Sequence, residues 1–386
     1  MERLKNIFVF IVLLLLTIPL LEWQINYARE KEFYQDAQLK GVFKDDTLPD
    51  MSIESWFSGS YQTTFDQALK FQIPFRPYFV RTSNQYAYHL FNKAKANGVK
   101  VGKKGYLYGQ HYLDAYNSDD FIGDSLILDR AHKLEQIRNW LKAQGKELVF
   151  VQAPGKAYYY PEYLRKEWIS HQEKNLNYLR YKQAFESYNI PYFDVQQWLL
   201  QFKDSMAHQV YPKTGIHWSV YAEHLVMDSL NRIIEQQLDT TLTRWDMVKV
   251  DTLKEPRDTD ADIEDGMNLL YPIKKEHFLY PSIALKEKNQ IPATVISDSF
   301  FWNIFANALA QNSLLPLDFL FYFDDYRSSE HMGSKPMDSY DLKAGIERSN
   351  VFVIICTDAK LSDTPWGFLE AMEEHYPSIF LDKQTQ

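Results

Sequence analysis

The sequence predicts an α/β protein with a mainly parallel sheet flanked by helices, preceded by an N-terminal membrane-anchor helix. From about residue 126 onward, short β-branched and aromatic runs alternate with amphipathic segments of helical period, which is the pattern of strands joined by crossover helices. Polar residues follow most of these apolar runs directly, and in open parallel sheets this edge is where ligands bind. An apolar run behind two basic residues predicts the anchor.

The first 23 residues have the pattern of an export signal. Arg3 and Lys5 precede the almost entirely apolar run Ile7–Leu21. Its length is short for a full span and also suits a cleaved signal peptide, but no small-x-small cleavage site follows, which favours an uncleaved anchor over 1–23. Basic residues before a span keep the N-terminus cytoplasmic. We therefore expect a single-pass protein of the bacterial cytoplasmic membrane with its body in the periplasm or extracytoplasmic space.

The remaining chain predicts two regions. Residues 24–95 have an amphipathic helical pattern and are expected to form a membrane-proximal helical region. Residues 96–386 are expected to form the α/β domain, with a polar, Asp-rich insertion at about 239–290. The expected strands of its sheet lie near residues 147–154, 190–195, 293–299, 317–325 and 351–357. The expected helices lie near 125–145, 171–188, 217–238, 300–311 and 367–376.

Composition excludes several classes of function. The 386 residues include 42 basic and 51 acidic side chains, a net charge of −9, and no long basic block, so nucleic acid is not an expected partner. The single cysteine, Cys356, excludes an intrachain disulfide and lies in an apolar run that predicts a buried strand.

No motif for a metal or a cofactor is present, and we expect neither. The chain has no P-loop, no dinucleotide-binding glycine fingerprint and no HExxH pair. The acidic stretch 258–270 starts like a calcium loop, but Ile263 stands where such a loop needs glycine and Leu269 where it needs the bidentate glutamate. This stretch is interpreted as a solvated acidic loop.

Ser299 is the first candidate for chemistry. It follows the run Thr294–Ser297 at a predicted strand-to-helix turn, where helix amides could stabilise an oxyanion. The alternative is a serine that caps the next helix, which is common. A nucleophilic serine needs a base, and His217 follows a Pro/Gly-containing loop and opens a predicted helix. From position alone, His217 could equally be a partly exposed histidine at a helix start.

Several motifs together resemble one family. Ser297–Phe300 (SDSF) resembles the GDS(F/L) block of SGNH hydrolases, with serine in place of glycine, and 215–218 (GIHW) resembles a D-x-H-W block. The histidine block precedes the serine block, as in the permuted polysaccharide O-acetyltransferase branch of the AlgX/AlgJ type. The stretches 101–109, 151–164 and 351–368 also resemble blocks of that branch.

The resemblance implies an SGNH-hydrolase-like fold and a serine-based site. Ser299 would be the nucleophile and His217 the general base. Gly215 stands where the family carries the aspartate that orients the histidine. The carboxylates considered as a substitute for it are Asp298, Asp194 and Asp324.

The resemblance also implies substrate contacts and partners. The expected substrate-binding residues are Arg327, Lys156 and Trp218. The expected function is extracytoplasmic O-acetylation of a secreted or cell-surface polysaccharide, with a multi-spanning membrane-bound acyltransferase supplying the acetyl groups. Two alternatives stay open: a carbohydrate esterase or deacetylase on the same scaffold, and a non-catalytic glycan-binding subunit, for which Gly215 is the main argument.

Overall fold

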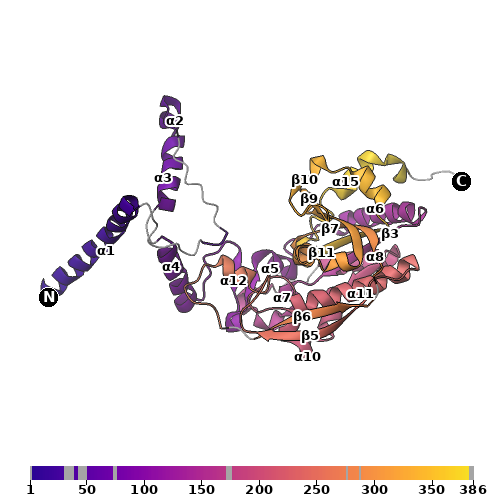
Figure 1. Ribbon diagram of the computed structural model, residues 1–386, viewed down its shortest axis with the longest axis horizontal. Coiled ribbons are helices and arrows are strands. Elements are labelled where there is room, and N and C mark those ends of the chain that lie inside the picture. Colours follow the sequence, from indigo (N-terminus) through magenta and orange to yellow (C-terminus); the bar gives the residue numbers. More distant parts are fainter. Residues whose placement is uncertain are drawn as a thin grey trace. The chain divides into compact units, whose positions relative to one another are not determined.

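The computed structural model describes residues 2–29, 39–41, 50–72, 76–170, 176–274, 277–286 and 288–381. The chain forms two compact units, one of Met1–Asn97 with Glu264–Pro272 and one of Gly98–Ile263 with Ile273–Gln386 (Figure 1). Parts of several predictions lie outside the described residues: residue 1 of the anchor 1–23; 30–38, 42–49 and 73–75 of the helical region 24–95; 171–175 of the helix expected at 171–188; 275–276 and 287 of the insertion at about 239–290; and 382–386 of the domain 96–386.

The smaller unit is helical over most of its described length. Its helices are α1 Glu2–Arg29, α2 Ile53–Ser58, α3 Ser60–Gln72 and α4 Arg76–Phe91. On α4, Arg81 and Asn84 donate side-chain hydrogen bonds of 3.0 and 2.8 Å to the carbonyls of Leu269 and Met267. These bonds tie the segment 264–272 to α4 within this unit.

The predicted membrane anchor is wrong. Among the residues that the structure describes, no helix has both the length and the apolar character needed to cross a membrane. The apolar run Ile7–Leu21 is shorter than the ~20 residues that a spanning helix requires. The single-pass membrane location inferred from this segment is corrected accordingly.

The larger unit is built on a seven-stranded sheet with the order β10-β9-β8-β7-β11-β3-β4 (Figure 1). Its strands are β3 Glu147–Ala153, β4 Tyr192–Asp194, β7 Ile291–Ser297, β8 Leu314–Phe321, β9 Asp325–Ser328, β10 Lys335–Pro336 and β11 Val351–Thr357. β8, β7, β11, β3 and β4 pair in parallel, whereas β9 and β10 are antiparallel to their neighbours. The predicted α/β class is confirmed, but the sheet is mixed. Only residues 322–324 separate β8 from β9, which is too short for a parallel crossover.

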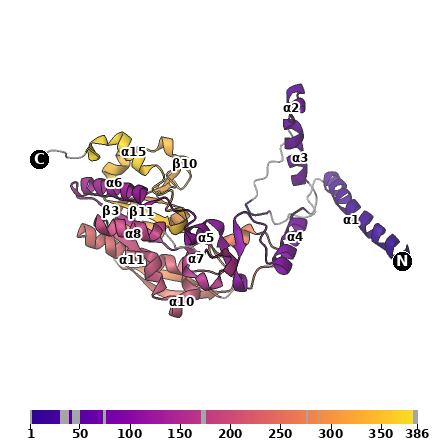
Figure 2. The ribbon, with the colours of Figure 1, turned by 180° about the vertical axis from the view of Figure 1, so that it is seen from behind.

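Alternate residues of the central strands serve two cores. Val149 and Val151 of β3 pack on the face covered by α11, whereas Leu148 and Phe150 pack on the face covered by α6 and α8. Figures 1 and 2 both show α6 and α15 on one side of the sheet and α11 on the other.

The α-helices of this unit are α5 Gln110–Asn117, α6 Asp124–Lys142, α7 Lys156–Tyr159, α8 Asn177–Ser187, α9 Val195–Leu200, α10 Lys203–Val210, α11 Val220–Leu238, α13 Trp302–Ala306, α14 Leu342–Arg348 and α15 Phe368–His375, while α12 Asp262–Gly266 begins in this unit and ends in the smaller one. Short 3-10 turns occupy Lys103–Gly105, Pro161–Tyr163, Lys166–Trp168, Ser299–Phe301, Ala310–Asn312, Met337–Ser339, Asp358–Lys360 and Pro377–Ile379.

Two antiparallel pairs stand beside the main sheet. β1 Val99–Val101 pairs with β2 Leu107–Gly109, and β5 Trp245–Leu253 pairs with β6 Phe278–Leu285. The β5–β6 pair accounts for much of the stretch 239–290 that the sequence marked as an insertion. The chain between these two strands includes the acidic loop that leads to Asp262, and this loop positions the site.

Candidate active site

Ser299 lies at the carboxyl edge of the sheet, two residues past the end of β7. The turn that holds it is capped by Asp298, whose carboxylate accepts hydrogen bonds from the Phe300 amide at 3.0 Å and from the Thr357 amide at 2.8 Å. The second bond joins the ends of β7 and β11. Because Asp298 is the capping residue, the hydroxyl of Ser299 remains available for another contact.

That contact is with His217. The Nε2 atom of His217 lies 2.8 Å from Ser299 Oγ, although the two residues are 82 positions apart in the chain. His217 precedes α11, whose N-cap is Ser219; the Ser219 hydroxyl accepts a hydrogen bond from the Ala222 amide. The imidazole therefore projects from a loop held firmly against a helix start.

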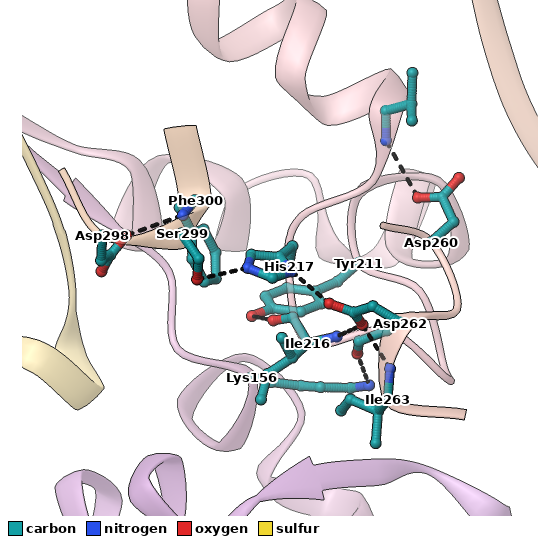
Figure 3. Close-up of polar contacts among 12 residues, drawn as sticks. Lys156, Tyr211, Ile216, His217, Asp260, Asp262, Ile263, Asp298, Ser299 and Phe300 are labelled. Atoms are coloured by element: carbon teal, nitrogen blue, oxygen red, sulfur yellow. Dashed lines mark hydrogen bonds and ion pairs between the residues drawn. The ribbon is translucent and has the colours of Figure 1, made fainter. Parts of the chain in front are cut away.

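Asp262 completes the hydrogen-bonded chain (Figure 3). Its Oδ2 lies 2.5 Å from His217 Nδ1, and its Oδ1 accepts bonds of 2.8 Å from the amides of Ile216 and Ile263. A carboxylate is only an acceptor, so we assign the Nδ1 proton to His217, which leaves Nε2 to accept the Ser299 proton. This is the arrangement of a serine nucleophile, a base and an orienting acid.

An aspartate at position 215 and the observed Asp262 are mutually exclusive ways to supply a carboxylate to His217. A Cβ atom at position 215 would lie 2.7 Å from the carbonyl oxygen of Thr259, 2.8 Å from Cγ of Pro212 and 3.0 Å from the carbonyl oxygen of Asp260. The loop that delivers Asp262 thus occupies the space that a side chain at 215 would need. Glycine at position 215 therefore leaves the room that the Asp262 loop needs. It does not mean that the site lacks an orienting carboxylate.

Two buried side chains hold the backbone that carries His217. Lys156 Nζ donates hydrogen bonds to the carbonyls of Lys213 and Gly215, at 2.8 and 2.5 Å, and the Tyr211 hydroxyl donates to the carbonyl of Ile216 at 2.6 Å (Figure 3). Burial lowers the pKa of the Lys156 amine well below its ordinary value, an effect that Asp262 opposes. The Lys156 amine thus donates hydrogen bonds to the loop that precedes His217 and is not exposed to solvent.

Tyr322 is a site residue that the sequence did not single out. Its hydroxyl lies close enough to Ser299 for that residue to influence its pKa. Burial, and secondarily Asp298, raises its pKa to about 12, so it is a neutral hydroxyl at physiological pH. Tyr322 and Phe323 have φ angles of 50° and 52°, a left-handed conformation that is uncommon for bulky residues and often occurs at functional sites. Its position just past β8 was the available signal.

None of the three carboxylates proposed as the third member takes the place beside His217 Nδ1. Asp298 is committed to the Phe300 and Thr357 amides. Asp194 accepts hydrogen bonds from the Gln197 amide and from the side chains of Tyr178 and Lys182. Asp324 is exposed in the turn between β8 and β9. The carboxylate that fills this place, Asp262, lies in the stretch interpreted as a solvated loop, an interpretation that is also wrong for Asp260, which is fully buried.

The three predicted substrate-binding residues differ in their exposure to solvent. Trp218 and Lys156 are both fully buried and cannot contact a substrate at the surface; Trp218 packs on Phe300 instead. Arg327 is 9% exposed; it pairs with Asp325, and its guanidinium lies 4.2 Å from the ring centre of Trp302. Of the three, Arg327 therefore remains as a candidate contact adjacent to the site.

The described residues contain no group of three His, Cys, Asp or Glu side chains that could hold a metal ion. Ser299, His217 and Asp262 together form the geometric arrangement of a serine, histidine and aspartate triad at the carboxyl edge of an α/β sheet. This class of site is defined by the geometry of the three groups and not by their spacing in the chain.

The comparison with protein families agrees with this class. Residues 99–261 match the family described as "SGNH hydrolase-like domain, acetyltransferase AlgX", so the resemblance of the chain to these acetyltransferases is confirmed. The matched region includes His217 and ends one residue before Asp262. No curated protein sequence matches the chain.

The chain also has some structural similarity to solved structures. The O-acetyltransferase domain of Pseudomonas putida AlgJ has 17% sequence identity and a TM-score of 0.47, covering 69% of this chain and 92% of its own. Bacillus cereus PatB1 with a sulfonyl adduct has 12% identity and a TM-score of 0.41, with coverages of 62% and 91%. Pseudomonas aeruginosa AlgX has 13% identity and a TM-score of 0.42, with coverages of 69% and 66%.

Proposed function

We propose that this chain is an O-acetyltransferase that modifies hydroxyl groups of a polysaccharide through an acetyl-enzyme on Ser299. The observation that supports this proposal best is the continuous chain from Ser299 through His217 to Asp262, with contacts of 2.8 and 2.5 Å. The acetyltransferase family of residues 99–261 supports the choice of acyl group and of a sugar acceptor.

The first half-reaction would load the serine. Ser299 Oγ attacks the carbonyl carbon of an acetyl ester while its proton moves to His217 Nε2. The imidazolium that forms is stabilised by the Asp262 carboxylate. When the ester bond breaks, the leaving group takes the proton from Nε2. The Ser299 amide stands at the start of a helical turn and is the proposed backbone donor for the oxyanion.

The second half-reaction would transfer the acetyl group. A sugar hydroxyl attacks the acetyl-serine and gives its proton to His217, which returns it to Ser299 Oγ as the ester forms. Trp302, three residues past Ser299 and 37% exposed, offers a flat apolar surface on which a sugar ring can pack. The guanidinium of Arg327 lies 4.2 Å from the centre of the Trp302 ring, and Arg327 is the proposed polar contact for the acceptor.

We retain the membrane-bound acyltransferase as the proposed source of acetyl groups. Its support is the family resemblance alone. It is tested by co-purification of the two proteins and by loss of glycan acetylation when either gene is deleted.

The decisive experiment is intact-mass spectrometry of the purified chain after incubation with p-nitrophenyl acetate. We expect the mass of one acetyl group to be added to the parent protein and not to Ser299→Ala, because the hydroxyl that contacts His217 Nε2 is that of Ser299. The matched control is Ser297→Ala, since Ser297 is the other serine next to Asp298 and its hydroxyl bonds instead to the Asp298 carbonyl. The control should still be acetylated.

Acceptor oligosaccharide added to the loaded enzyme separates the remaining functions. Transfer of the acetyl group from Ser299 to the oligosaccharide supports the acetyltransferase. Release of that acetyl group as free acetate in the presence of acceptor supports the esterase alternative. An unmodified parent protein excludes both. The non-catalytic alternative rested on the missing carboxylate at 215, and Asp262 now supplies a carboxylate to His217.

A further inference from the structure

The first turn of α11 touches elements that carry all three members of the site. His217 precedes this turn by the two residues Trp218 and Ser219. The loop that carries Asp262 and the helix that follows Ser299 both bond to the same turn. A common frame of this kind explains how groups so distant in sequence meet at hydrogen-bond distance.

Asp260 is the contact from the Asp262 loop. Its side chain is fully buried, and its Oδ1 accepts a hydrogen bond of 3.2 Å from the Val220 amide, the first residue of α11 (Figure 3). The first amides of a helix have no partner within the helix, so an acceptor here is stabilising. Asp260 thereby joins the acidic loop to the helix start that follows His217.

Tyr280 closes the loop from the other side. Its hydroxyl on β6 accepts a hydrogen bond of 2.6 Å from the Arg257 amide and lies close enough to the Asp260 carboxyl to affect the pKa of that group. The Asp260 and Asp262 amides donate to the carbonyls of Arg257 and Thr259. The turn 257–262 is thus compact and fastened at both ends, which leaves the Asp262 carboxylate little freedom.

Glu223 makes the corresponding link to the nucleophile. It is buried in the first turn of α11, and its Oε2 accepts a hydrogen bond of 2.6 Å from Asn303 of α13. α13 begins directly after the turn that contains Ser299. The base, the acid and the nucleophile are therefore each tied to one turn of one helix.

We propose that Asp260 is a positioning residue that sets the Asp262 carboxylate against His217 by bonding to the α11 N-terminus. Its effect on the reaction rests on the function proposed above. Burial of this carboxyl raises its pKa to about 7, an effect that Tyr280 and the Val220 amide oppose. Burying a carboxyl group costs folding free energy. The contacts of Asp260 are with the loop and the helix start that bring Asp262 to His217.

The test is Asp260→Ala in the full chain, with Glu255→Ala as the control because Glu255 is an exposed acid of the same loop. A proton shared between His217 Nδ1 and Asp262 gives a far-downfield resonance in the ¹H NMR spectrum, which His217→Ala must abolish. We expect Asp260→Ala to remove or shift this resonance and to lower kcat with p-nitrophenyl acetate by roughly 10²-fold, since small displacements at a catalytic group cost about that much. KM should change little.

Asp260→Asn should restore much of the signal and rate, because its amide oxygen can still accept from Val220. A folded Asp260→Ala protein that keeps the resonance and the kcat of Glu255→Ala overturns the proposal. Should Asp260→Ala not fold, Tyr280→Phe, which removes only the hydroxyl, must weaken the same resonance, and an unchanged spectrum is equally contrary. The resonance is read without substrate, so it stays informative even if Ser299 proves not to be acetylated.

Discussion

Replacing Asp262 by asparagine is expected to reduce kcat for acetyl transfer by about 10³–10⁴-fold, the scale seen when the acid of a serine triad is converted to its amide. An asparagine that keeps its bonds from the Ile216 and Ile263 amides through its oxygen presents its NH2 group to His217. The neutral imidazole must then carry its proton on Nε2 rather than on Nδ1. In that tautomer Nε2 can no longer accept the Ser299 proton.

Steady-state kinetics with p-nitrophenyl acetate measure this effect, and Asp258→Asn is the matched control. Asp258 is an exposed acid in the same loop, and its left-handed φ of 52° suits asparagine. We expect the control to stay within about twofold of the parent, since isolated surface changes have small effects. Activity of Asp262→Asn close to that of Asp258→Asn contradicts the assignment of Asp262 as the orienting acid.

Restoring the family aspartate at position 215 is expected to damage the protein rather than improve it. The added Cβ would meet two backbone carbonyls at 2.7 and 3.0 Å, and backbone atoms cannot move aside as a flexible side chain can. Overpacking of this kind costs about 1–3 kcal/mol of the free energy of unfolding. The relief available is movement of the 257–262 turn, which withdraws Asp262 from His217.

We therefore expect Gly215→Ala alone to lower both thermal stability and kcat, and Gly215→Asp to lower them further. The double variant Gly215→Asp with Asp262→Ala should stay inactive, because an aspartate at 215 has no room to orient the imidazole in this loop arrangement. Gly333→Ala is the control, since a Cβ there meets nothing within 4 Å. Recovery of activity in the double variant would falsify the view that the two acid positions exclude each other.

The five parallel strands of the sheet were predictable because each is encoded locally, whereas β9 and β10 were not predicted. β11 is buried along its whole length, as a central parallel strand must be, and its sequence is a continuous apolar run. The direction of β9 was not predictable from composition, because it depends on a connection of three residues that cannot cross over. The helix expected at 300–311 is instead two short 3-10 turns around α13, with Ala308 in a left-handed conformation.

The site likewise contains residues that the sequence indicated and one that it did not. Ser299 and His217 lie in short motifs where the backbone changes from strand or loop to helix. Local pattern made both of them candidates, and the resemblance of their motifs to one family related them. Asp262 has no such signature: it is one of several acidic residues between Asp258 and Asp265. Nothing in that local pattern distinguishes the buried Asp260 from the exposed Asp258.

By itself, then, the sequence determined the α/β class and the strand that ends near Ser299, because hydrophobic period and turn chemistry are properties of neighbouring residues. It related His217 to Ser299 only through the resemblance of their motifs to one family. Only the tertiary structure decided which carboxylate orients the histidine. That choice depends on a loop between β5 and β6 that docks on the start of α11 and fills the space above Gly215. The absence of a side chain at 215 and the presence of Asp262 are one packing solution, and packing between distant segments is not written in either segment alone.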